Sequence, residues 1–206
     1  MAMLAPPMLE QDLKLELKSY DDLLAMPDDG NRYELIFGEI VMSPAPATKH
    51  QFVLGELYAN FRDQVAKKLL GVVLFAPVDV KFSQFSVVEP DLIVVKGNRA
   101  RIVTEKNVDG VPDLVVEILS PNNRAQDLVR KAALYTQYGV PEYWIVDPET
   151  DRITVNVLRE GQYAPLRNRG GFARSEVLAG FKVRVKDIFT PSELLDPASD
   201  ATNETE

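Results

Sequence analysis

Residues 111–120, with the sequence VPDLVVEILS, constrain the fold more than any other stretch of the chain. They form a short apolar run of strand-forming residues, opened by a Val-Pro pair and followed by another proline. Such runs are typical of strands that are covered on both faces, at the centre of a parallel or mixed sheet. Glu117 interrupts the run near its end. Because a buried carboxylate is costly unless a cation or a donor meets it, we interpret Glu117 as functional first and structural second.

The elements around this run predict an α/β domain with a central mixed sheet flanked by helices. Apolar residues at helical spacing predict one helix over 48–68 and a second that Asn123 caps and that Gly139 ends. The second helix is the crossover that joins the 111–119 strand to the next strand. The other strands are expected over residues 32–37, 39–42, 72–75, 78–82, 91–95, 142–146 and 153–158, near residue 163 and over 181–185.

The length of 206 residues suits one domain, which we place at residues 15–190. A flexible N-terminal arm (1–14) and an acidic C-terminal tail (191–206) are expected to flank it. No apolar segment is long enough to cross a bilayer, and the first residues do not resemble a secretory signal, so a cytoplasmic protein without a membrane partner is expected. The net charge of −8 argues against a large nonspecific nucleic-acid surface, which needs a basic footprint.

Composition also restricts the metals that the chain can bind. It has no cysteine and a single histidine, His50, which excludes thiol catalysis and zinc sites built from Cys or several His residues. Any metal must be held by oxygen ligands, which favours Mg²⁺ or Mn²⁺. For His50 itself, a role in capping or packing is preferred over assistance at a phosphate.

Two carboxylates mark the ends of two apolar strands. Asp91 opens one strand and Glu117 closes another, so the pair meets if these strands are neighbours. Like charges at that distance repel unless a divalent cation lies between them, and such a pair commonly holds Mg²⁺. The alternative is that Asp91 only begins its strand and contacts water.

Lys131 is the predicted third member of this group. It lies about 10 Å along the second helix, and Glu117 lies about 7 Å back from the end of its strand. A helix that folds back over the sheet brings the Lys131 ammonium level with Glu117. In that position its stem borders the core, so we expect its removal to change stability little. The alternative is an exposed pair with Asp127 on the helix surface.

Several short motifs occur in an order that resembles a known family. They are Tyr33-Glu34-Leu35, His50, Pro90-Asp91-Leu92, the 112–120 strand, the Asp127…Lys131 spacing and residues 142–147. Together they resemble the bacterial restriction endonuclease family called Uma-two, of the PD-(D/E)XK nuclease superfamily, over about residues 15–190. The resemblance implies a restriction-endonuclease-like core and a Mg²⁺-dependent endonuclease that hydrolyses phosphodiester bonds in DNA.

The resemblance also implies roles for individual residues. Asp91 matches the first acidic position and Glu117 the second, and both would be metal ligands. The superfamily's lysine position holds Leu119 here, so Lys131 is the residue that fits its role. Glu34 matches an N-terminal acidic position and would be an outer metal or water ligand.

Two further expectations concern partners and activity. The departure at Leu119 and the acidic composition leave open a catalytically inactive binding or assembly module with the same fold. A homodimer is expected, because two protomers would frame a duplex, with the contact near residues 143–158. Tyr143 and Trp144 are interpreted as core or interface residues.

Overall fold

The computed structural model describes residues 17–43, 46–120 and 124–190. The predicted arm and tail and the predicted cap Asn123 therefore lie outside the described residues. The helical segments are α1 (Tyr20–Leu24), α2 (Thr48–Phe61) with a π-helical continuation (Arg62–Ala66), a 3-10 segment (Gly97–Ile102), α3 (Arg124–Tyr138) and α4 (Val185–Phe189). Both long helices were predicted from their apolar spacing. In the described residues, no helix is long and apolar enough to span a membrane.

A mixed sheet of six strands forms the centre of the molecule, in the order β11-β10-β9-β8-β6-β3. The strands are β3 (Gly71–Phe75), β6 (Leu92–Lys96), β8 (Leu114–Ile118), β9 (Glu142–Asp147), β10 (Arg152–Arg159) and β11 (Gln162–Pro165). β8 runs parallel to β9 and antiparallel to β6, and α3 is the crossover from β8 to β9. Every residue of β8 is buried, so the predicted central strand and mixed sheet are confirmed.

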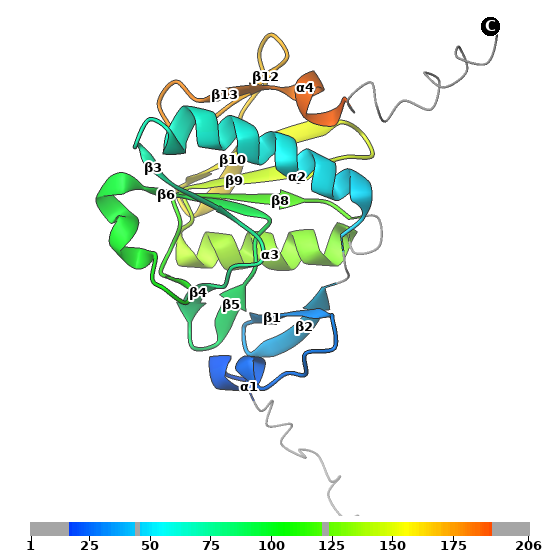
Figure 1. The fold of residues 1–206 in the computed structure, drawn as a ribbon, viewed down its shortest axis with the longest axis vertical. Coiled ribbons are helices and arrows are strands. Elements are labelled where there is room, and N and C mark those ends of the chain that lie inside the picture. Colours follow the sequence, from blue (N-terminus) through cyan, green and yellow to red (C-terminus); the bar gives the residue numbers. More distant parts are fainter. Residues whose placement is uncertain (1–16, 44–45, 121–123, 191–206) are drawn as a thin grey trace, which may run out of the picture.

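The two long helices cover opposite faces of this sheet (Figure 1). Side chains alternate between the faces of a strand, and β8 follows that rule. Val116 packs in the core that includes Phe61 of α2, whereas Val115 packs in the core that includes Leu134 and Tyr135 of α3. Glu117 belongs to the same face as Val115. The alternation therefore directs the carboxylate toward α3.

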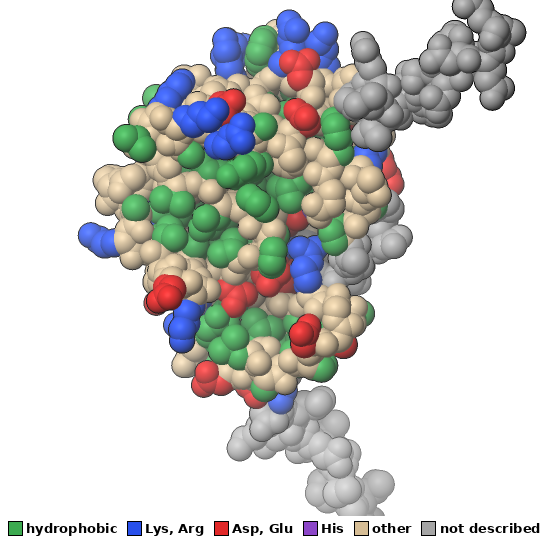
Figure 2. All heavy atoms as spheres, in the orientation of Figure 1, with side chains coloured by type: hydrophobic (Ala, Val, Ile, Leu, Met, Phe, Trp, Pro, Cys, Tyr) green, Lys and Arg blue, Asp and Glu red, His purple; other side chains and the backbone are tan. Residues whose placement is uncertain are grey.

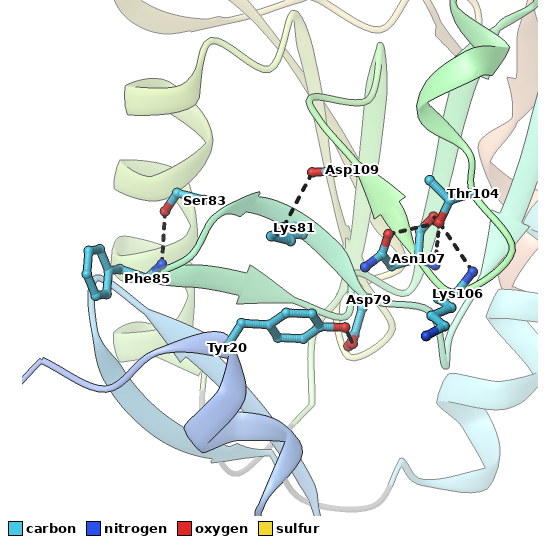
Figure 3. A network of polar contacts seen from close by, with 9 residues as sticks. All are labelled: Tyr20, Asp79, Lys81, Ser83, Phe85, Thr104, Lys106, Asn107 and Asp109. Carbon is cyan, nitrogen blue, oxygen red and sulfur yellow. Dashed lines mark hydrogen bonds and ion pairs between the residues drawn. The ribbon is translucent and has the colours of Figure 1, made fainter.

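A second sheet has the order β2-β1-β5-β4-β7. Its strands are β1 (Arg32–Ile36), β2 (Glu39–Ser43), β4 (Val80–Ser83), β5 (Ser86–Val88) and β7 (Val108–Asp109). Figure 3 shows Tyr20 of α1 pointing toward Asp79, just before β4, where its hydroxyl donates to Asp79 Oδ2 over 2.7 Å. In the turn before β7, the Thr104 hydroxyl donates to the carbonyl of Asn107 over 2.8 Å. These contacts fix the loops around the sheet, whose first strand supplies Glu34.

A third, two-stranded sheet pairs β12 (Phe172–Arg174) with β13 (Lys182–Arg184). β5, β7 and β12 were not predicted, because strands of two or three residues are too short to show a periodic pattern.

The β9–β10 hairpin, where a dimer contact was expected, contributes its two strands to the central sheet. Both strands are interior to the six-stranded sheet, and Tyr143 and Trp144 are 1% and 0% exposed. Their interpretation as core residues is confirmed, and the dimer contact expected near residues 143–158 stays a prediction. The homodimer itself stays a prediction, which light scattering at micromolar concentration tests.

Glu142 is a buried carboxylate that the sequence did not single out. It is 0% exposed, and its Oε1 accepts the Trp144 indole N–H over 2.6 Å. Its Oε2 accepts the backbone N–H groups of Glu176 and Val177, at 2.7 and 3.1 Å. One side chain at the start of β9 thereby holds the loop between β12 and β13.

Replacing Glu142 by Ala should destabilise the protein by about 3 kcal/mol, because three N–H donors lose their acceptor. Urea unfolding followed by circular dichroism measures the change. The matched control is Glu105→Ala at an exposed position, which should stay within about 0.5 kcal/mol of the wild type. Equal stabilities for the two variants would contradict this role for Glu142.

Candidate active site

Asp91 and Glu117 meet because their strands are neighbours. β6 and β8 are antiparallel with Leu92 opposite Val116, so Asp91, one residue earlier, lies opposite Glu117, one residue later. Asp91 Oδ2 accepts the backbone N–H of Ile118 over 2.7 Å. Asp91 is 5% exposed, so the alternative in which it contacts only water is wrong.

Lys131 reaches this pair from α3. Its Nζ lies 3.0 Å from Glu117 Oε1 and 3.0 Å from Glu34 Oε1. Only 11% of its side chain is exposed, so the alternative of an exposed lysine on the helix surface is wrong. The expected small effect on stability must also be revised, because the ammonium is enclosed between two carboxylates. Lys131 thus joins β1 of the second sheet to β8 of the central sheet.

Glu34 belongs to the same cluster. It is 3% exposed, and its Oε1 accepts the backbone N–H of Glu89 over 2.7 Å as well as contacting Lys131. The structure therefore brings together all four residues that the sequence singled out. Their catalytic and metal-binding roles stay predictions.

Two further side chains contact the cluster. The Tyr135 hydroxyl donates to Glu117 Oε1 over 2.5 Å, and His50 Nε2 lies 3.2 Å from Asp91 Oδ1. Sequence reasoning assigned Tyr135 to the apolar stripe of its helix. Its position four residues after Lys131 was the available signal, because residues at that spacing share a helix face. His50 is buried, and it packs against a carboxylate of the cluster.

Asp113 and Leu119 lie close to Glu117 in the sequence, but their polar contacts are with residues outside the cluster. Asp113 is buried four residues before Glu117, but its carboxylate accepts the Lys96 backbone N–H at 2.8 Å and an Arg99 guanidinium N–H at 3.0 Å. Leu119, where the resemblance led us to expect a lysine, is half-buried, and its backbone N–H donates to the carbonyl of Val146. Asp113 therefore anchors the start of β8.

The cluster holds three buried carboxylates and one lysine. Burial raises the pKa of Glu117 to about 8, against the lowering effect of Lys131 and with a further rise from the charges of Asp91 and Glu34. Burial alone would lower the pKa of Lys131, but Glu117 and Glu34 outweigh it and raise that pKa, so the ammonium stays charged. Burial and the same carboxylates raise the pKa of Tyr135, which keeps its hydroxyl a donor.

The donor chemistry of the site fits a hard divalent cation. All three acidic residues offer oxygen, and Mg²⁺ typically binds through one or two carboxylates while it keeps several waters. Within the described residues there is no group of three His, Cys, Asp or Glu side chains arranged to hold a metal. A cation here would therefore rely on two side chains, with Asp91 and Glu117 the adjacent pair.

A family model described as "Uma2: Putative restriction endonuclease" matches residues 20–186. The chain belongs to this family. Among solved structures it is similar to a crystal structure described as a putative nuclease from Anabaena variabilis, with a TM-score of 0.68 and 20% sequence identity over 83% of this chain and 97% of that chain. This likeness confirms the predicted restriction-endonuclease-like fold. A search of curated proteins finds no match.

The raised pKa of Glu117 predicts a pH dependence of stability in metal-free buffer. A carboxyl group with a higher pKa in the folded chain stabilises the fold below its unfolded value, and that contribution is lost as the pH rises through about 8. The free energy of unfolding should therefore fall between about pH 5 and about pH 8, and Glu117→Gln should flatten this dependence. Urea unfolding across that range measures it. The control Glu105→Gln should keep the wild-type profile, and an unchanged slope in Glu117→Gln would contradict the assignment.

Proposed function

We propose that this protein is a Mg²⁺-dependent endonuclease that hydrolyses phosphodiester bonds in DNA. One observation carries the proposal: the buried carboxylates Asp91 and Glu117 lie side by side on neighbouring strands, and Lys131 contacts Glu117 together with the buried Glu34. Buried carboxylates that lie this close together are costly for a fold, and they suit a site that takes up a divalent cation. Membership of a family described as restriction endonucleases supports the same reaction class.

Asp91, Glu117 and the backbone carbonyl of Ile118 would hold the cation. When bound, it lowers the pKa of a coordinated water and neutralises charge on the scissile phosphate. Hydrogen bonds and an ion pair within the protein already hold these two carboxylates in place. Asp91 is held by the Ile118 N–H and by His50, and Glu117 is held by the Tyr135 hydroxyl. Such fixed orientation keeps ligands in place without reorganisation during the reaction.

Lys131 supplies positive charge and N–H donors beside Glu117. In the reaction it would orient the attacking water or stabilise negative charge that develops on the phosphate. Glu34 holds the other side of the same ammonium and would anchor a water of the cation. The lysine thus acts from α3 in place of the position that Leu119 fills.

One observation favours a second candidate function, in which the protein is a catalytically inactive nuclease-like module for binding or assembly. The carboxylate oxygens of Asp91 and Glu117 already have partners in the protein, from Ile118, His50, Lys131 and Tyr135. Calorimetry with Mg²⁺ separates the two functions. Affinity in the millimolar range or tighter, lost in Asp91→Asn, supports the nuclease, and no binding supports the module.

Supercoiled plasmid incubated with Mg²⁺ or Mn²⁺ should be nicked or linearised. Asp91→Asn and Glu117→Gln should each lower the rate by about 10² or more, because each removes one preorganised charged group. Gel electrophoresis follows the conversion, and Glu105→Gln is the matched control. Full activity in either site variant would place the chemistry elsewhere, and no cleavage by the wild type despite metal binding would favour the module.

Replacing Lys131 by Met should abolish cleavage and raise the affinity for Mg²⁺, because an internal cation that competes for Glu117 and Glu34 is removed. It should also destabilise the metal-free protein by about 3 kcal/mol, since breaking a buried pair leaves uncompensated charge. Leu119→Lys in the same chain should restore part of the activity, because positions 117 and 119 share a strand face. Calorimetry, urea unfolding and plasmid cleavage provide the three measurements. Wild-type cleavage by Lys131→Met would remove the lysine from the mechanism.

A further inference from the structure

The β12–β13 sheet has one apolar face and one basic face. Ala173 and Val183 are buried against the core, whereas Arg174, Lys182 and Arg184 are exposed. In the register of the sheet, Phe172 lies opposite Arg184 and Arg174 lies opposite Lys182. The outer face therefore carries three cations and one aromatic ring. We call these four residues the basic face.

The Phe172 ring organises the three cations. The Arg174 guanidinium lies 5.6 Å from the ring centroid, the Lys182 ammonium 5.0 Å and the Arg184 guanidinium 5.7 Å. Cation–π contacts of this kind hold long side chains near the ring and reduce their freedom. The backbone is fixed as well, because Gln64 Nε2 donates to the Lys182 carbonyl over 2.9 Å.

Positive charge continues beyond the basic face. An open pocket of about 620 Å³ adjoins it and is lined by Pro165, Leu166, Arg167, Asn168, Arg169 and Arg174. Residues 165–186 contain six basic residues and one acidic residue, Glu176, which already pairs with Arg159 at 2.7 Å. Figure 2 shows Lys and Arg side chains gathered at this end of the molecule, over β12 and β13.

Apart from their contacts with Phe172, these cations have no acidic partner in the described part of the chain. Across residues 17–43, 46–120 and 124–190, none of Arg174, Lys182 and Arg184 forms an ion pair. Charged residues on short outer strands also prevent edge-to-edge pairing, but that role does not require a single sign of charge. The net charge of −8 is an average over the chain, and it is compatible with a small local cluster of positive charge.

We infer that the basic face and its pocket bind the phosphodiester backbone of a nucleic acid. Clustered guanidinium groups match phosphate oxygens in charge and geometry, and the half-buried Phe172 ring offers an apolar surface beside them. The inference rests on the proposed nuclease function. To that function it adds a second surface that contacts the substrate, separate from the catalytic cluster.

The test is binding of a fluorescein-labelled DNA duplex in EDTA, followed by fluorescence anisotropy at several salt concentrations. The triple variant Arg174→Ala/Lys182→Ala/Arg184→Ala should bind about tenfold or more weakly. The slope of log affinity against log salt should shrink by about 3, since each lost phosphate contact removes about 0.9. The matched control Lys68→Ala/Arg101→Ala/Lys106→Ala removes equal charge from exposed positions elsewhere and should change neither quantity as much.

The outcomes separate this inference from the proposed function. In EDTA, Glu117→Gln should bind the duplex like the wild type, although in Mg²⁺ it should cleave more slowly. A wild type that binds through the basic face without cleaving supports the inference and counts against the nuclease. A triple variant that binds and cleaves like the wild type overturns the inference and leaves the nuclease intact. Polyglutamate that competes with the wild type as well as unlabelled duplex at equal charge also overturns it, in favour of an acidic polypeptide partner.

Discussion

The ammonium of Lys131 is the contact on which the rest of the site depends. It is enclosed by Glu117 from the central sheet and Glu34 from the second sheet, and its Nζ lies 3.0 Å from a carboxylate oxygen of each. Without it, three buried carboxylates would face one another in a medium of low dielectric constant, where repulsion is strong. Lys131 therefore contributes both to the packing of α3 against the two sheets and to the charge balance of the site.

The sequence predicted the parts of this arrangement that follow from regular patterns. The apolar run at 111–119 required a covered strand, and Asp91 and Glu117 stood out because they end apolar strands. The helix after β8 was long and amphipathic enough to identify as a crossover, which placed Lys131 near the sheet. These inferences succeeded because periodicity and burial cost are local properties that a single chain displays.

Other features depend on contacts between distant segments, which leave no local signal. Tyr135 reads as an apolar core residue, and only the packing of α3 shows that its hydroxyl meets Glu117. Glu142 looks like the polar start of a strand, yet it accepts three hydrogen bonds from residues up to 35 positions away. The depth of Lys131 was underestimated for a related reason, because the second sheet that encloses it was not placed from the sequence.

Because the cluster is divided between two sheets, it cannot form early in the folding of the nascent chain. Glu34 is synthesised long before Lys131, and the two meet only after α3 has packed between elements that are far apart in sequence. A chain that is still emerging from the ribosome, or one whose sheets have come apart, has no assembled cluster. Any chemistry at this site is thereby restricted to the fully folded molecule.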